Sequence, residues 1–258
     1  MKTWLAVALM AGGLGMATMA QADGQALAVE PDYLAPPASL APGRVQAMQQ
    51  RLLDWPGLAR YREDNARLPP REPGRVVFYG DSITDGWGRI PGTTFFPGLP
   101  YVNRGISGQT TAQMLVRFRQ DVIALHPEVV VILAGTNDIA GNTGPATLEM
   151  IGDNLRSMTQ LAQANGIRVV LASVLPASAY PWRPGHQPAT KIRALNAWIA
   201  QYARESGAVY LDYHGALANA EGGLDEKWAA DGVHPTPAGY AVMAPLARQA
   251  IDLALEAE

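Results

Sequence analysis

The sequence contains no cysteine among its 258 residues. This absence excludes a disulfide-stapled scaffold, a thiol nucleophile, a thiolate zinc site and a cysteine-bound iron–sulfur cluster. Histidine is scarce as well. Any mechanism that needs an imidazole must therefore use one of four residues, which are His126, His186, His214 and His234.

An excess of positive charge is also missing. The chain has 20 Lys and Arg residues against 23 Asp and Glu residues, and its formal net charge is −3. A nucleic-acid-binding protein would carry a basic face, and so would a protein held on anionic lipid, so both classes are disfavoured. Apolar residues make up 48% of the chain and charged residues 17%. This balance and the length predict a sizeable core in one or two domains.

The N-terminal segment has the composition of a targeting signal. Residues 3–22 carry no charge after a positive start at Lys2, and they end in Ala20-Gln21-Ala22, an A-x-A cleavage pattern. We interpret residues 1–22 as a signal peptide. We therefore expect a periplasmic or secreted protein with no stable membrane insertion after cleavage. An uncleaved membrane anchor is the alternative, because the length would permit one.

Two further regions follow the signal. Residues 23–74 hold 8 of the 20 prolines, and they are predicted to form an extended arm with one helix from about Val45 to Arg67, interrupted at Pro56. From residue 75 to 258, short apolar runs alternate with segments of helical periodicity. The runs are rich in β-branched residues, which is typical of buried parallel strands. The pattern predicts one domain with a five-stranded parallel sheet in a three-layer α/β/α sandwich.

The boundaries of these elements follow from periodicity, caps and breakers. The predicted strands are 76–79, 101–103, 129–134, 167–174 and 208–211. The predicted helices are 110–125, 145–165, 190–206 and 237–255.

Polar clusters come directly after the predicted strands. In parallel α/β sheets the ligand binds beyond the carboxyl ends of the strands, so these clusters are expected to meet at one edge. The clusters occupy residues 80–86, 103–111 and 135–138, and a further one occupies residues 231–235.

These clusters contain the groups that a serine-dependent acyl transfer requires. A serine hydroxyl is a weak nucleophile, so Ser82 would need a base, and His234 is a suitable one. Asp231 lies three residues before His234, where a turn would let its carboxylate orient the imidazole. The developing oxyanion would need donors, which the N–H of Ser82, the N–H of Gly108 and the side-chain amide of Asn137 could supply. Each of these residues also has a purely structural reading, as a helix cap or a turn residue.

Other polar residues near these clusters have different expected roles. Asp81 and Asp138 are expected to hold backbone rather than to react. His214 follows the last strand and could approach the site. Asp231 and His234 supply two metal ligands where catalytic zinc usually takes three, so neither a metal nor another cofactor is expected.

In these clusters the chain resembles the SGNH/GDSL hydrolase superfamily of esterases and lipases. The resemblance spans about residues 75–250 and leaves the proline-rich arm unexplained. It is strongest to the branch of platelet-activating-factor acetylhydrolase, lysophospholipase L1 and carbohydrate acetylesterases. It implies a flavodoxin-like fold and a catalytic triad, and the G-x-S-x-G elbow of a rival fold is absent around Ser82. The matching residues are Gly80, Asp81, Ser82, Gly108, Gly135, Asn137, Asp138, Asp231 and His234.

The substrate is predicted from the loops at this edge. No long lid separates the clusters, so we expect a compact site that hydrolyses short-chain esters, acetyl above all, on a small molecule or a carbohydrate. Trp182 in the proline-rich loop 175–186 and Trp87 after the serine turn are candidate substrate contacts, although Trp182 could merely pack its loop. The alternatives are a lysophospholipase or thioesterase with the same mechanism, or a non-catalytic carbohydrate-binding module of the cell envelope.

Overall fold

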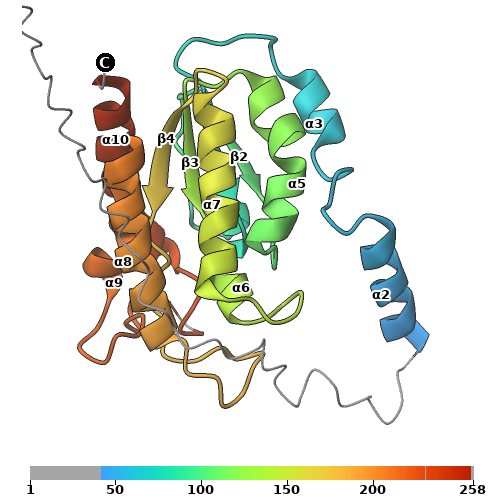
Figure 1. Ribbon diagram of the computed structural model, residues 1–258, viewed down its shortest axis with the longest axis vertical. Helices are drawn as coiled ribbons and strands as arrows, with labels where there is room; N and C mark the ends of the chain where they lie inside the picture. The colour runs from blue at the N-terminus through green and yellow to red at the C-terminus, as the bar shows by residue number, and fades with distance from the viewer. Residues whose placement is uncertain (1–41, 230, 257–258) are drawn as a thin grey trace, which may run out of the picture.

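The computed structural model describes residues 42–229 and 231–256 (Figure 1). The expected signal peptide and the first part of the arm lie outside the described residues. Five parallel strands form one sheet in the order β2-β1-β3-β4-β5, which is the flavodoxin-like order. The predicted fold class is therefore confirmed. The strands are β1 (Val76–Gly80), β2 (Tyr101–Gly105), β3 (Val129–Leu133), β4 (Arg168–Ala172) and β5 (Val209–Leu211).

Long helices cover both faces of the sheet, as expected for buried parallel strands. They are α5 (Thr111–Asp121), α7 (Leu148–Gln163), α8 (Ala189–Ser206) and α10 (Pro237–Glu256). The short elements are α4 (Ser82–Gly86), the 3₁₀ helix η1 (Ile123–Leu125), α6 (Thr136–Ile139) and α9 (Tyr213–Leu217). The predicted helix 110–125 is divided, because the backbone at Val122 leaves the helical region between α5 and η1.

The core has two layers because successive strand side chains point to opposite faces. Val77 of β1 pairs in register with Val102 and Val130, and it packs with α5, α7 and α8. Phe78 points the other way and packs with α9 and α10. Since β1 and β3 are buried along their whole length, the middle of the sheet is a rigid base for the loops that follow it.

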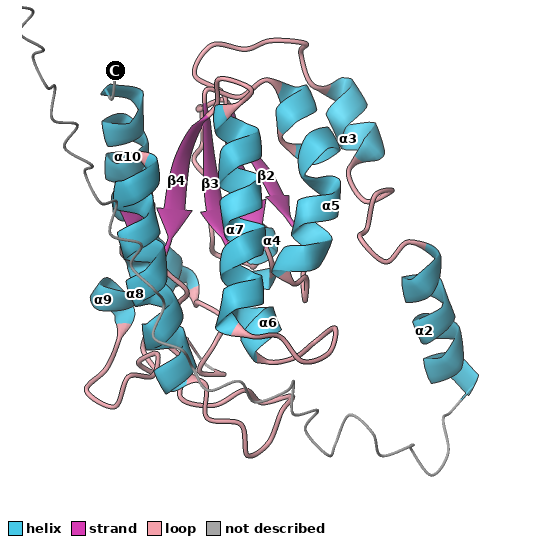
Figure 2. Cartoon of the chain, in the orientation of Figure 1, coloured by secondary structure: helices cyan, strands magenta, loops and turns pink. Residues whose placement is uncertain are grey.

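The carboxyl ends of the strands meet at one edge, as the arrowheads in Figure 2 show. The short helices α4 and α6 begin there, directly after β1 and β3. The loop after β2 and the turn before α10 complete the same edge. All four polar clusters of the sequence therefore lie where the strand alternation predicted them.

The arm contains two helices rather than the single interrupted helix that we predicted. They are α2 (Pro42–Leu53) and α3 (Arg62–Arg67), and residues 54–61 join them as a loop around Pro56. Helix α2 stands clear of the sheet in Figure 1. Hydrogen bonds fasten the loop and α3 to the domain through Gln113, Gln120 and Asp121. None of the helices in the described ranges is long and apolar enough to cross a bilayer.

Candidate active site

Ser82 is the first residue of α4, at the end of β1. The backbone turns sharply before it, and a Cβ at Gly80 would come within 2.1 Å of Thr84 Oγ1 and 2.8 Å of Leu133 O, so only glycine fits. The carboxylate of Asp81 accepts a hydrogen bond from the N–H of Ile83 at 3.0 Å. Asp81 therefore holds the turn, which is the structural role that the sequence predicted for it.

The structure brings Ser82, His234 and Asp231 into one hydrogen-bonded chain. Ser82 Oγ lies 2.9 Å from His234 Nε2, and His234 Nδ1 lies 2.6 Å from Asp231 Oδ2. A carboxylate can only accept, so Nδ1 carries the proton and Nε2 is left as the acceptor for the serine hydroxyl. This is the arrangement in which an imidazole can take a proton from a serine hydroxyl.

Asp231 is held by its own turn. Its Oδ1 accepts the backbone N–H groups of Val233 at 3.0 Å and His234 at 2.7 Å, which leaves Oδ2 for the ring. Partial burial acts to raise the pKa of the Asp231 carboxyl. The hydrogen bonds from these backbone groups and from the imidazole outweigh burial, so the pKa is lowered. The carboxyl is therefore ionised at neutral pH and suited to stabilise an imidazolium.

The two other expected oxyanion donors, Gly108 and Asn137, share Asn142 as a hydrogen-bond partner. Gly108 has a φ of +79°, a left-handed conformation that favours glycine. Asn137 Nδ2 donates to Gln109 O at 3.0 Å, in the same loop. Asn142 Nδ2 donates to Asn137 Oδ1 at 2.7 Å and approaches Gly108 O at 3.2 Å. Because Asn142 donates to its oxygen, the orientation of the Asn137 amide is fixed, with an N–H directed to the loop after β2.

Two buried carboxyls support this edge without joining the triad. Asp138 accepts the backbone N–H of Thr111 at 2.9 Å and its hydroxyl at 2.6 Å, so it anchors the start of α5. Burial raises the pKa of Asp138, and the bonds from Thr111 act against that shift. Burial also raises the pKa of Asp81 to about 7, while the N–H of Ile83 and the charge of His234 act to lower it. Asp81 thus titrates near neutral pH.

Trp182 and Trp87 have different surroundings. Trp182 is half-exposed, stacks on Tyr180 at 5.0 Å between ring centroids, and lies 6.0 Å from the ring of His234. Its indole N–H donates to Asn142 Oδ1 at 3.2 Å. Trp87 is 3% exposed, and its ring packs against Phe78, Phe96 and Tyr240. The expectation that Trp87 contacts substrate is corrected: its indole N–H is used by Thr94 O and its ring belongs to the core.

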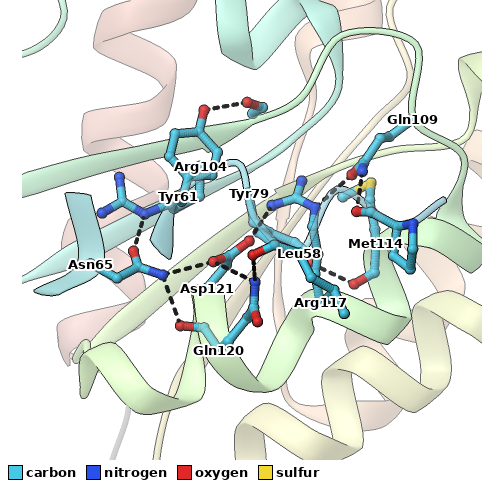
Figure 3. Close-up of polar contacts among 12 residues, drawn as sticks. Leu58, Tyr61, Asn65, Tyr79, Arg104, Gln109, Met114, Arg117, Gln120 and Asp121 are labelled. Carbon is cyan, nitrogen blue, oxygen red and sulfur yellow. Dashed lines mark hydrogen bonds and ion pairs between the residues drawn. The ribbon is translucent and has the colours of Figure 1, made fainter. Parts of the chain in front are cut away.

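Sequence reasoning missed a buried arginine, Arg117, that links the end of β1, directly before Asp81 and Ser82, to the loop after β2 (Figure 3). Arg117 is fully buried, and its guanidinium bonds Gln109 Oε1 at 2.5 Å, Gly80 O at 3.1 Å and Asp121 Oδ2 at 3.2 Å. Arg117 and Asp121 are four residues apart on a helix, a spacing typical of exposed ion pairs, so no local signal marked them as buried.

The other candidates lie elsewhere. The backbone N–H of His214 donates to Ser173 Oγ at 2.8 Å at the start of α9, which places His214 with Ser173 rather than with the triad. Among the residues that the structure describes, no group of three or more His, Asp or Glu side chains is arranged to hold a metal ion.

Comparison with known proteins identifies the class. The model of the GDSL-like lipase/acylhydrolase family matches residues 78–242, so the chain belongs to this family, as the SGNH/GDSL resemblance implied. A solved GDSL-like lipase of Bacteroides thetaiotaomicron is 44% identical, with a TM-score of 0.74, and the match covers 78% of this chain and 99% of the lipase.

Two curated relatives are named as esterases. Esterase TesA of Pseudomonas aeruginosa is 34% identical over 139 residues, which are 52% of this chain and 60% of that protein. An acetylxylan esterase of Geobacillus stearothermophilus is 26% identical over 203 residues, which are 66% of this chain and 90% of that protein. These matches support the expectation that the chain is a carboxylic ester hydrolase.

Proposed function

We propose that the protein is an exported serine esterase that hydrolyses short-chain carboxylic esters, acetyl esters above all. Its proposed natural substrates are acetylated carbohydrates. The observation that carries the proposal is the chain of hydrogen bonds from Ser82 Oγ through His234 to Asp231. The relatives named as an esterase and as an acetylxylan esterase support the reaction class.

The proposed reaction proceeds in two halves. Ser82 Oγ attacks the ester carbonyl carbon while its proton passes to His234 Nε2, and Asp231 stabilises the imidazolium. The N–H of Ser82, the N–H of Gly108 and the amide of Asn137 stabilise the negative oxygen. The tetrahedral intermediate collapses, and the alcohol leaves with the proton from His234. A water molecule, deprotonated by His234, then releases the acid from Ser82 by the same steps.

The direct test is a chain-length series of 4-nitrophenyl esters, from acetate to dodecanoate, with the wild type beside Ser82→Ala. We expect Ser82-dependent hydrolysis that is highest with acetate. A maximum at long chains would move the substrate to lipids or thioesters and overturn the acetyl preference. No turnover of any ester, and no labelling of Ser82 by a fluorophosphonate probe, would favour the binding-module alternative.

A further inference from the structure

A cavity of about 810 Å³ adjoins the oxyanion side of the candidate site. Its walls come from the arm loop (residues 54–61), from the loop after β2 and from the segments that carry Asn142 and Trp182. Gly108, a proposed oxyanion donor, and Asn142, which bonds the side chain of Asn137, line the cavity directly. Trp182 forms the side nearest His234, since the two rings are 6.0 Å apart.

The cavity is much larger than an acetyl group needs. Pockets of roughly 300–1,000 Å³ hold whole small ligands, whereas an acetyl group ends in a single methyl. If the enzyme removes short acyl groups, as proposed above, the cavity is available for the alcohol part of the ester. The present inference rests on that proposed function.

The lining residues favour a sugar over a lipid. Trp55 and Trp182 contribute half-exposed indole rings, 40% and 39% exposed, from separate segments of the chain. An indole face matches the C–H face of a pyranose, and such half-exposed rings favour ligands with one apolar face and polar edges. Ile106 is the one aliphatic residue of the lining, so the cavity lacks the row of aliphatic side chains that would form a groove for a long acyl chain.

Polar groups complete the lining. Asp54 uses one lone pair of each carboxylate oxygen on the N–H groups of Leu58 and Ala59, at 2.7 and 2.8 Å, and it keeps further lone pairs for sugar hydroxyls. No residue that lines the cavity is basic, and Asp54 adds a negative charge. A phosphate-bearing head group would therefore be repelled rather than paired.

The arm loop is fastened to the catalytic domain through its backbone. The side-chain amides of Gln113, Gln109 and Gln120 donate to the carbonyl oxygens of Trp55, Pro56 and Leu58 at 2.6, 2.6 and 2.7 Å. Figure 3 shows the bond from Gln120 to Leu58 within the network that Arg117 joins. Because the carbonyl groups carry the attachment, replacing the Trp55 side chain leaves the loop fastened.

The geometry points to a sugar subsite in which Trp55 of the arm and Trp182 of the 175–186 loop hold the carbohydrate of an acetylated substrate. The arm, which the family resemblance leaves unexplained, then forms a wall of the substrate site. Trp182 packs near the ring of His234 and bonds Asn142, whereas the one hydrogen bond given for Trp55 is accepted by its backbone carbonyl, so Trp55 is the cleaner of the two tryptophans to test.

The test compares two substrates and three variants of the full chain. We expect Trp55→Ala to lower kcat/KM on acetylated xylotetraose by about five- to tenfold relative to kcat/KM on 4-nitrophenyl acetate. Trp55→Phe, which keeps an aromatic face, should recover most of that ratio. Leu53→Ala is the matched control, since Leu53 is an exposed arm residue outside the cavity, and it should leave both activities as in the wild type.

Binding without turnover separates this inference from the proposed function. Calorimetric titration of Ser82→Ala with xylotetraose should show binding that adding Trp55→Ala weakens by about five- to tenfold. An active enzyme whose substrate ratio and xylotetraose affinity do not respond to Trp55→Ala would overturn the subsite and leave the esterase intact. A selective loss on 4-nitrophenyl dodecanoate instead would overturn it in favour of an acyl groove. If the wild type hydrolyses no ester, the proposed function fails, and the titration alone decides the subsite.

Discussion

The side chains of the proposed base and of the carboxylate that orients it lie at the surface, whereas three polar side chains that follow β1 and β3 lie in the core. The side chains of His234 and Asp231 are 34% and 42% exposed. Asp81, Asn137 and Asp138 are 1%, 2% and 5% exposed. The exposed pair is held by one short turn. In the buried group, Asp81 bonds the N–H of Ile83 in α4, and Asn137 and Asp138 of α6 bond the loop after β2 and the start of α5.

This difference fits the proposed mechanism. In that mechanism the imidazole exchanges protons with an alcohol and with water, so it needs access to both and a local partner. Donors for an oxyanion act most strongly where water is excluded and where they are already oriented. We therefore expect substitutions in the exposed pair to remove activity and spare stability, and substitutions in the buried group to affect both.

The largest effect is expected from His234→Ala. Loss of the base should lower kcat by about 10⁴-fold or more, as much as Ser82→Ala, because the triad acts as a unit. The melting temperature should stay within about 2 °C of the wild type, since the ring is partly exposed and buries little. The measurement is kcat with 4-nitrophenyl acetate beside a thermal melt, and Lys227→Ala in the same loop is the control for both. A His234→Ala enzyme with near-normal turnover would refute the base assignment.

The second effect is a dependence of folding stability on pH, through the buried carboxyl of Asp81. The folded-state pKa of Asp81 is raised by burial to about 7, above its ordinary value of 3.8. Between these values the folded protein keeps the proton that the unfolded chain has lost, so raising the pH through this window destabilises the fold by at most about 4 kcal/mol. Below pH 3.8 both states are protonated, and the dependence ends.

Asp81→Asn tests this linkage. The amide is neutral at every pH, and its oxygen can still accept the N–H of Ile83. Urea unfolding at about pH 4.5 and about pH 7.5 should show a smaller loss of stability on raising the pH in the variant than in the wild type. An unchanged difference between the two pH values would show that Asp81 ionises in the folded protein as it does in the unfolded one.

Asn137→Ala should affect both properties. Removing one oxyanion donor typically costs about 2.7–4 kcal/mol in the transition state, so kcat should fall by about 10²–10³-fold with KM nearly unchanged. The fold should also lose about 1–2 kcal/mol, because the bonds to Gln109 and from Asn142 disappear from a buried position. A change confined to KM would make Asn137 a substrate-binding residue instead.

A second buried asparagine provides the matched control. Asn196 is 6% exposed and bonds the backbone of Val174 through both side-chain atoms, at 2.8 and 2.9 Å, away from the triad. Asn196→Ala should lose stability similarly and keep kcat. If both variants lose kcat to the same extent, the effect of Asn137→Ala is structural rather than catalytic.

The same division explains what the sequence could predict. The strands, the polar clusters that follow them and the Asp231–His234 turn depend on residues that are close in sequence. The structure contains the strands, and it places the clusters and the turn at the expected edge of the sheet. The alternation of apolar runs with helical segments was enough to predict the fold class. The predicted and observed ends of the elements differ by a few residues, for example where a change of backbone conformation at Val122 ends a helix.

The parts that sequence reasoning missed depend on contacts between distant segments. Gln109 and Pro56 are 53 residues apart, and Gly80 and Arg117 are 37 apart, so no local pattern marks either contact. The position of Trp87 directly after the serine turn predicts a substrate contact. In the structure the indole N–H of Trp87 donates to Thr94 O, and its ring is buried against Phe96 and other aromatic rings. This burial depends on tertiary packing, which the local sequence does not show.

The smallest effect is expected at Asn142, where the exposed and buried parts meet. Its amide orients Asn137 and receives the indole N–H of Trp182, so Asn142→Ala should lower kcat by about tenfold with a smaller change in KM. Asn142→Asp should be the more damaging variant, because a carboxylate facing Asn137 Oδ1 would favour a flipped amide that turns its oxygen toward the oxyanion. Measuring kcat and KM for both variants distinguishes a role in positioning Asn137 from a role in packing. Equal losses of kcat would mean that Asn142 only fills space beside Trp182. A greater loss of kcat with aspartate would show that the side-chain amide of the exposed Asn142 sets the orientation of the buried Asn137 amide.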